Sequence, residues 1–302
     1  PEISQIFGEL IGAWVADIWM QAGKPAGFNL IELGPGRGTL AADMMRMIKR
    51  LPACAAAAKL HLVEISPTLA AKQAEVLQEY APAWHKTVAT VPAGFSIIVA
   101  NEFFDALPIR QFVLTDGKWC ERFVGYDMHR KELFFTLKPH DGTGLPSGLP
   151  EDAIVERGEA AVDVVGHIAA RLKQHGGAML AIDYGYLMPA MKDTLQGYKK
   201  HRFTSALSHP GAQDITADVD FSALAAAARA SDLAVHGPVT QGAFLTTLGI
   251  SQRALKLSEK ASMKQREDIA LAIRRLTAVS DMGQRFKVIA FSHGKLKPAG
   301  FA

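Results

Sequence analysis

The sequence predicts an α/β fold built on a mostly parallel sheet with helices on both faces. Three observations lead to this class. Short apolar runs of strand length recur at residues 30–33, 60–64, 95–100 and 178–183. Longer segments with a helical spacing of apolar residues separate them, and such alternation is typical of parallel sheets. The first run ends in a glycine-rich loop that leads into a helical segment, which is how doubly wound sheets build a nucleotide site.

The composition bounds the class of protein. Of 302 residues, 49% are hydrophobic and 21% charged, so we expect a single domain over residues 1–302 with insertions and a substantial core. The net charge of +3 is spread along the chain, which predicts no nucleic-acid partner. No apolar run reaches the length of a membrane span. Two isolated cysteines and ten scattered histidines lack metal-ligand spacing, so we expect no metal.

The chain begins at Pro1, without Met, inside a segment with the apolar spacing of an amphipathic helix over residues 1–21. We therefore expect that an N-terminal piece of the natural chain, with any targeting peptide, precedes Pro1. The alanine-rich composition favours a bacterial, cytoplasmic protein; a eukaryotic one would belong in the mitochondrial matrix. The sequence leaves the oligomeric state open, with a homodimer as one option.

The glycine loop after the first strand is the first chemical feature. Gly34, Gly36 and Gly38 are spaced two apart, and the acid Glu32 stands two residues before them. The dinucleotide fingerprint has a wider spacing. The acid and the tight spacing resemble the first motif of class I S-adenosylmethionine (AdoMet) methyltransferases. A carboxylate suits the cationic end of AdoMet, so we expect Glu32 and the loop from Leu33 onward to bind it. Another nucleotide fold and a structural glycine turn are the alternatives.

The second strand, residues 60–64, also ends in an acid, Glu64. In doubly wound nucleotide folds an acid at this place accepts hydrogen bonds from ribose hydroxyls. Its usual distance from the glycine loop is about 20 residues, and the alanine-rich stretch 51–59 lengthens it here. We expect Glu64 and Ile65 to contact the cofactor, with a merely solvated acid as the alternative. A helix over residues 67–80 follows.

The third strand, residues 95–100, runs into the second chemical feature. An amide, two acids and two aromatic residues stand together there: Asn101, Glu102, Phe103, Phe104 and Asp105. The position just beyond a strand end is where α/β folds place ligands.

Residues 110–136 change character, because their apolar residues alternate and turn signals separate the runs. This predicts an antiparallel meander, inserted over about residues 110–150. A helix over 156–174 then leads to the strand 178–183. Asp183 and Tyr184 stand at the tip of that strand, so both are candidates for the substrate site.

The last third of the chain begins with a long, polar, weakly patterned stretch, residues 187–220, and we expect a lid-like loop there. We group residues 187–282 as a lid and helical substrate region. The remaining elements are a helix, a short strand, a mostly helical stretch and a strand that closes the sheet, at residues 221–230, 233–236, 244–279 and 285–291.

Six stretches together resemble the MidA-like methyltransferases, bacterial relatives of the mitochondrial complex I assembly methyltransferase: residues 32–40, 62–67, 101–112, 182–186, 237–244 and 282–288. Residues 1–9 also look like a family segment that normally follows more chain. The resemblance implies a class I methyltransferase fold with a seven-stranded sheet and AdoMet as the cofactor. It also implies methylation of arginine on a protein, which for the mitochondrial member is a complex I subunit.

Arginine methylation gives a role to residues 101–105, which we call the acidic block. Methyl transfer from a sulfonium requires positioning and charge stabilisation, and no metal. A guanidinium must lose a proton, and carboxylates can orient it through paired hydrogen bonds. We therefore expect Glu102 and Asp105 to be catalytic and Asn101 to contact AdoMet. Phe103 and Phe104 are candidates to face a cation. The alternatives are core packing for both aromatics and helix capping for Asp105.

Two other functions stay open. A protein with this fold can keep the AdoMet site and act as an assembly factor without robust turnover. A nicotinamide-dependent dehydrogenase is the weaker alternative, because the glycine spacing argues against it.

Overall fold

The computed structural model describes residues 4–188, 191–199, 202–259 and 261–301. The first three residues of the predicted N-terminal helix therefore lie outside the described residues. Contacts within the chain group it into two compact units, which we describe separately. The first unit is Pro1–Phe103, Val165–Tyr184 and Ala225–Ala302, and the second is Phe104–Val164 and Gly185–Leu224.

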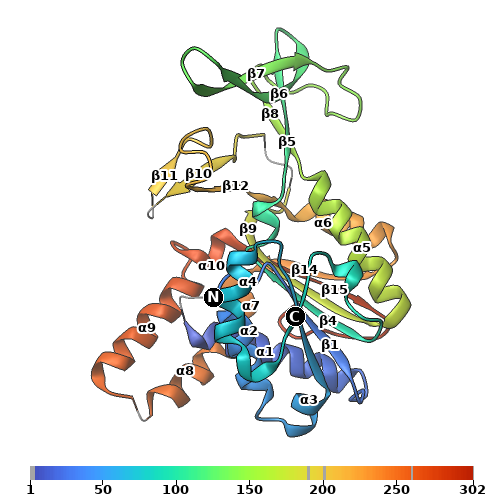
Figure 1. Ribbon diagram of the computed structural model, residues 1–302, viewed down its shortest axis with the longest axis vertical. Coiled ribbons are helices and arrows are strands. Elements are labelled where there is room, and N and C mark those ends of the chain that lie inside the picture. The colour runs from blue at the N-terminus through green and yellow to red at the C-terminus, as the bar shows by residue number, and fades with distance from the viewer. Residues whose placement is uncertain (1–3, 189–190, 200–201, 260, 302) are drawn as a thin grey trace. The chain divides into compact units, whose positions relative to one another are not determined.

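The first unit is built on the predicted sheet (Figure 1), whose order is β14-β15-β9-β4-β1-β2-β3. Its strands are β1 (Phe28–Leu33), β2 (Ala58–Val63), β3 (Ala83–His85), β4 (Ser96–Asn101), β9 (Gly177–Tyr186), β14 (Ala234–Thr240) and β15 (Phe286–His293). From β3 to β9 all neighbours are parallel, which confirms the mostly parallel sheet. The strand β15 runs antiparallel to both neighbours. It is the last strand of the chain to join the sheet, and it lies between β9 and β14.

Helices cover both faces of this sheet. Those of the first unit, or reaching into it, are α1 (Gln5–Gln21), α2 (Thr39–Ile48), α3 (Pro52–Ala57), α4 (Pro67–Val76), α5 (Glu159–His175), α6 (Phe221–Ala230), α7 (Gln241–Thr247), α8 (Ile250–Ser258), α9 (Met263–Thr277) and α10 (Met282–Arg285). One sheet face packs its apolar side chains against α1, α2 and the helices α7 to α9 in a single buried cluster. Buried side chains of α5, including Val165 and Leu172, are not part of that cluster.

The close crossing of α1 and α2 depends on two glycines of α1. A Cβ atom at Gly8 would lie 2.3 Å from Cβ of Asp43, and one at Gly12 would lie 2.8 Å from the carbonyl oxygen of Met44. Both distances are shorter than atoms tolerate, so only glycine lets the two helices approach this closely. The same packing fixes the glycine loop, because α2 begins directly after Gly38.

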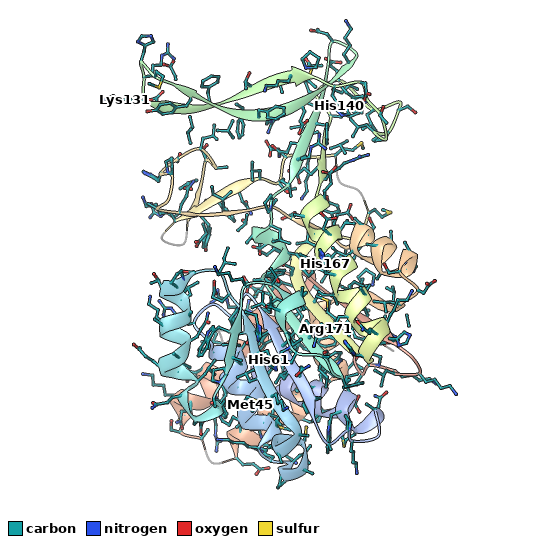
Figure 2. All side chains as sticks on the ribbon, turned by 45° about the vertical axis from the view of Figure 1, so that its right-hand side comes forward. Met45, His61, Lys131, His140, His167 and Arg171 are labelled. Carbon is teal, nitrogen blue, oxygen red and sulfur yellow. The ribbon has the colours of Figure 1, made fainter. Side chains whose placement is uncertain are left out.

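The second unit contains two small antiparallel sheets. The predicted meander forms β5 (Arg110–Thr115), β6 (Lys118–Asp127) and β7 (Glu132–Pro139), and β8 (Ile154–Arg157) adds a fourth strand in the order β7-β6-β5-β8. Figure 2 marks the two ends of β7, with Lys131 just before it and His140 just after it.

The stretch 187–220 is more regular than the sequence predicts. It contains a sheet of β10 (Gln196–Lys199), β11 (Arg202–Thr204) and β12 (Asp214–Thr216), and the short strand β13 (Val219–Asp220), which pairs with the end of β9. The expectation of a loop is wrong here, because strands of two to four residues are too short to show an alternating pattern. Among the described residues, no helix combines the length and the apolar composition that crossing a membrane requires.

Candidate functional site

The glycine loop follows β1 and has the backbone conformation that glycine favours. Gly34, Gly36 and Gly38 have φ angles of 60°, 54° and 81°, in the left-handed region. The amide of Gly34 donates to the carbonyl of Val63 over 3.0 Å, which ties the loop to β2. A Cβ atom at Gly36 would meet no atom within 4 Å. The loop therefore presents backbone to open space at Gly36, where a ligand can approach.

Glu32, one residue before the end of β1, is a buried carboxyl with an unused oxygen. Its side chain is 3% exposed, and its Oε2 atom has no hydrogen-bond partner among the described residues. Burial raises the pKa of Glu32 to about 8, although a backbone hydrogen bond from Ala41 favours the ionised form. Buried polar atoms are usually paired, so this oxygen fits a site that a cationic ligand group completes.

Glu64 follows β2 directly and is held in place by its neighbours. Its Oε1 accepts from the amide of Ser66 over 2.8 Å, and its Oε2 accepts from Nε2 of Gln73 over 3.1 Å. The same nitrogen of Gln73 donates to the carbonyl of Gly36 over 2.8 Å, and Trp84 Nε1 donates to Gln73 Oε1 over 2.9 Å. Thus one buried amide links the predicted ribose acid to the glycine loop. The apolar side chain of Ile65 is 80% exposed beside this acid.

Gln73 and Trp84 are site residues that the sequence analysis missed. A signal for Gln73 exists in the sequence, since it stands between Leu69 and Leu77 at helical spacing, inside an apolar stripe. A polar residue in such a stripe has to find buried partners.

The tip of β4 brings Asn101, Glu102 and Phe103 to the glycine loop. Asn101 is buried and donates from Nδ2 to Oε1 of Glu102 over 3.3 Å. Glu102 is exposed and has a φ of 50°, a strained conformation that clusters at functional sites. The ring of Phe103 covers Gly34, because a Cβ atom there would lie only 2.9 Å from it. The amide of Glu102 donates to the carbonyl of Ile182 over 2.9 Å, which fixes the strained residue.

Asp183 is fully buried at the neighbouring strand β9. Its two carboxylate oxygens accept from the amides of Phe103, over 3.1 Å, and of Tyr184, over 3.0 Å. The Tyr184 ring packs against Phe286 at 5.5 Å, and the guanidinium of Arg285 lies 5.0 Å from its centre. Asp183 thus anchors backbone at the tips of β4 and β9.

Phe104 and Asp105 belong to the second unit, so the predicted acidic block divides between the two units. Both residues are buried and lie in a short 3-10 helix, Phe104–Ala106. The carbonyl of Asp105 accepts from the amide of Ala217 over 3.0 Å. In the first unit, the structure brings together Glu32, the glycine loop, Glu64 and the Asn101–Phe103 tip.

Comparison with known proteins gives a consistent result. A family model for S-adenosyl-L-methionine-dependent methyltransferases matches residues 10–239. The protein named "Protein arginine methyltransferase NDUFAF7, mitochondrial" is 37% identical in Danio rerio, with 95% of this chain and 74% of that protein covered. Its Homo sapiens counterpart is 34% identical, with 96% and 72% covered.

Two solved structures from Burkholderia thailandensis are similar over nearly the whole chain. One is 29% identical with a TM-score of 0.88 and covers 100% of this chain and 83% of that one. The other, solved bound to S-adenosyl-homocysteine, is 28% identical with a TM-score of 0.86 and covers 99% and 79%. The unpartnered Glu32 oxygen and the open space at Gly36 fit AdoMet as the ligand. The chain therefore belongs to the MidA-like family of S-adenosyl-L-methionine-dependent methyltransferases.

Proposed function

We propose that this methyltransferase acts on an arginine side chain of a protein and that Glu102 holds the guanidinium. The observation that carries this proposal is the backbone of Glu102, a non-glycine residue with a φ of 50° at the tip of β4. Strain of this kind costs about 1–3 kcal/mol and persists where surrounding structure enforces it. The relatives named protein arginine methyltransferase support the choice of acceptor.

Different residues of the first unit bind different parts of AdoMet. Glu32 takes the cationic amino-acid end of AdoMet, and the loop from Leu33 to Gly38 approaches it through backbone. Glu64 accepts from the ribose hydroxyls, and exposed Ile65 lies against the adenine. Asn101, with its side chain bound to Glu102, links the cofactor side of the site to the acceptor side.

AdoMet supplies the methyl group when it is bound. The acceptor guanidinium is cationic before and after the reaction, and the nitrogen that takes the methyl group loses one proton. The carboxylate of Glu102 accepts two parallel hydrogen bonds from it, which fixes the orientation of the attacking nitrogen. The same carboxylate stabilises the guanidinium charge and is positioned to accept the departing proton. Asp105, Phe104, Asp183 and Tyr184 are further candidates on the acceptor side.

By resemblance, the acceptor is a subunit of a complex I-type quinone oxidoreductase, reached in the cytoplasm if the source is bacterial. The test is mass spectrometry of these subunits from cells with and without the gene. We expect an arginine that is methylated only in cells that have the gene. Complementation with a Gly36→Val variant is the control for AdoMet dependence, and it should fail to restore the mark.

A second measurement separates the enzyme from an assembly factor. Purified protein, AdoMet and the identified subunit should yield S-adenosyl-homocysteine. If AdoMet binds but neither cells nor the purified reaction show methylated arginine, the assembly-factor alternative holds. Family membership already removes the dehydrogenase alternative.

A further inference from the structure

A pocket of about 790 Å³ lies within the second unit. Ligand pockets usually have roughly 300–1,000 Å³, an apolar wall and a few polar groups. The apolar side chains that line this one are Leu145, Pro146, Val155, Val162 and Met191. Val162 is 38% exposed and Met191 54%, so part of the apolar wall is open to an occupant.

The charges of the pocket are mostly negative. The charged side chains that line it are Glu156, Glu159, Asp163, Asp220 and Arg157. Glu159 is paired with Arg110, whose Nη1 donates to its two oxygens over 3.2 and 3.3 Å. In the part of the chain that the structure describes, the partners of Glu156 and Asp220 are neutral groups. Asp163 is exposed on α5.

Arg157 does not cancel this negative charge. Its Nη2 donates to the carbonyl of Gly144, and its guanidinium lies 5.9 Å from the centre of the Phe112 ring. One guanidinium thus stands against the carboxylates of Glu156, Asp163 and Asp220. The excess of negative charge attracts a cation and repels an anion.

Asp220 offers the pocket a carboxylate oxygen. Its Oδ1 accepts from the amides of Ser222, over 2.9 Å, and of Ala223, over 3.0 Å, and from the hydroxyl of Ser222 over 2.5 Å. Its Oδ2 has no hydrogen-bond donor among the described residues. Pairing of β13 with β9 sets Asp220 opposite Tyr186. The carboxylate is therefore fixed, and one of its oxygens is left for a ligand.

Tyr186 places an aromatic ring beside these carboxylates, since it also lines the pocket. Burial raises the pKa of its hydroxyl, and the carboxylates of Asp220 and Glu156 raise it further. An aromatic ring next to carboxylates suits a cation. Tyr186 is the last residue of β9, the strand that also carries Asp183 and Tyr184. These two are candidates for the acceptor side of the site.

We propose that this pocket binds a second basic residue of the acceptor protein, close in sequence to the arginine that is methylated. The aliphatic part of that lysine or arginine packs against Val162 and Met191, and its charged end meets Oδ2 of Asp220 and the ring of Tyr186. The volume also admits an apolar neighbour of the basic residue. This inference rests on the proposed function, because it names a feature by which the acceptor is selected.

Direct binding is measured with a fluorescent pentapeptide in which leucine and lysine alternate. The matched control is the pentapeptide in which leucine and glutamate alternate. By fluorescence polarisation, the full-length protein with S-adenosyl-homocysteine should bind the lysine peptide at least about 10-fold more tightly, which is roughly 1.4 kcal/mol. Equal binding of both peptides, or binding of neither, would overturn the proposal. Spermidine carries charge without apolar side groups and should compete poorly. Competition by spermidine as strong as by unlabelled lysine peptide would show that the pocket takes small cations and not a peptide.

Asp163 and Asp268 provide a matched pair of variants. Both are exposed helical residues, Asp163 on α5 at the pocket and Asp268 on α9 in the first unit. Asp163→Lys should weaken binding of the lysine peptide and raise KM for the acceptor about 10-fold, with kcat and AdoMet affinity within twofold. Asp268→Lys makes the same change of charge and should leave all four quantities within twofold. Equal effects of the two variants would mean that the pocket has no special part in binding.

A second pair keeps the test decisive if lysine at 163 disturbs folding. Val162→Glu and Val162→Lys place long charged side chains of opposite sign at one position of the pocket wall. Val162→Lys should raise KM for the acceptor, and Val162→Glu should leave it unchanged or lower it. A change in the same direction in both variants would exclude the charge argument.

The acceptor itself supplies the last measurement. Each lysine or arginine near the methylated arginine is replaced in turn by norleucine or citrulline, which removes the charge. One replacement should raise KM about 10-fold with the wild-type enzyme and much less with Asp163→Lys, since residues in contact are energetically coupled. Methylation that no such replacement affects would reject the pocket and leave the proposed function intact. Binding of the lysine peptide that Asp163→Lys weakens, without any methylated arginine, would reject the proposed function and leave the pocket as a site for basic segments.

Discussion

The buried side-chain amide of Gln73 donates a hydrogen bond to Glu64 over 3.1 Å. The second hydrogen of the same nitrogen is used by the carbonyl of Gly36, at 2.8 Å. One side chain of α4 therefore sets the distance between the tip of β2 and the glycine loop. Residues that do not contact a ligand but orient the groups that bind it often affect ligand affinity nearly as strongly as those groups do.

Replacing Gln73 by leucine should weaken AdoMet binding without touching the ligand. The change leaves the Gly36 carbonyl, the Glu64 carboxylate and the Trp84 N–H without their partner. Orphaned buried polar groups cost about 1–3 kcal/mol, so the melting temperature should fall. AdoMet affinity, measured by calorimetry, should fall roughly 10-fold, which is about 1.4 kcal/mol. Lys72→Leu, at the exposed neighbouring position of α4, is the control and should bind normally. Wild-type affinity in Gln73→Leu would show that Glu64 needs no such support.

The parts of the site that the sequence predicts are those with a local signal. The buried runs of β1, β2 and β4 are visible because a strand inside a parallel sheet is apolar on both faces. The left-handed turns at Gly34, Gly36 and Gly38 are visible because glycine tolerates them.

The parts that the sequence does not predict depend on residues far apart in the chain. That Gln73 reaches back to Gly36, and that Phe103 covers Gly34, follows only from the way the strands align in the sheet. The division of the acidic block between Phe103 and Phe104 likewise follows from contacts with later segments, such as the bond from Ala217 to Asp105. Neither has a signature in the local pattern.

Gly36→Val should abolish AdoMet binding while the fold survives. A Cβ atom at this position meets no protein atom within 4 Å, so the branched side chain occupies the path of the ligand rather than the core. The φ of 54° adds strain of roughly 1–2 kcal/mol for a residue other than glycine. Gly117→Val is a matched control, because Gly117 has a φ of 68° and equally open space in the β5–β6 turn. Both variants should lose similar stability, and only Gly36→Val should lose AdoMet binding by calorimetry. A folded Gly36→Val protein with normal affinity would remove the loop from the site.

Glu32 should make stability fall as the pH rises toward 8. Its pKa in the folded protein is about 8, above the ordinary value of 4.5, so the unfolded chain releases this proton first. Below about pH 4.5 both states hold the proton and Glu32 has no effect. Between pH 4.5 and pH 8 the free energy of unfolding falls by about 1.4 kcal/mol per pH unit. Above pH 8 Glu32 lowers it no further. Urea unfolding without ligand at pH 5.5 and pH 7.5 should show Glu32→Gln to be more stabilised, relative to wild type, at the higher pH. An equal difference at both values would mean that Glu32 is ionised in the fold.

AdoMet binding should oppose this effect, because a cationic group beside Glu32 favours the ionised carboxylate. Wild-type affinity should therefore rise between pH 5.5 and pH 7.5, and the rise should be smaller in Glu32→Gln. Calorimetry in buffers of different ionisation enthalpy should detect a proton released on binding to wild type alone. Proton release of the same size in both proteins would place another group beside the cationic end of AdoMet.

The stretch 187–220 should be cut first by dilute trypsin, and AdoMet or acceptor should slow the cutting. Its sheet consists of strands of three and four residues, which are marginal by themselves and open locally at low free energy. The comparison is the β6–β7 turn, where exposed Arg130 and Lys131 offer equally good trypsin sites. Mass spectrometry of the first fragments identifies the site. Early cleavage confined to the β6–β7 turn would make the β6–β7 hairpin, and not residues 187–220, the mobile element.

Glu102 allows its charge and its backbone strain to be tested separately. Glu102→Gln keeps the shape and removes the charge, whereas Glu102→Gly removes the side chain and accepts the φ of 50° without strain. In the proposed role Glu102 acts on the transition state rather than on AdoMet, so both variants should keep AdoMet affinity within a few-fold. Both should lose roughly 10²-fold or more in turnover, the scale of a positioned acid–base group. Glu102→Gly should be as stable as wild type or more so, which excludes unfolding as the cause.

Asp105→Asn is the comparison and should lose less turnover if Asp105 serves mainly its own short helix. The measurement pairs calorimetric AdoMet affinity with methyl transfer to the acceptor identified in cells. Normal turnover in Glu102→Gln would make the carboxylate structural and its strained backbone incidental. Loss of AdoMet binding in Glu102→Gln would assign Glu102 to the cofactor site instead. The catalytic carboxylate would then be Asp105 or Asp183, and comparing the turnover of Asp105→Asn with that of Asp183→Asn would decide between them. Because Asp183 accepts from the backbone amides of Phe103 and Tyr184, the melting temperature of its variant has to be measured as well.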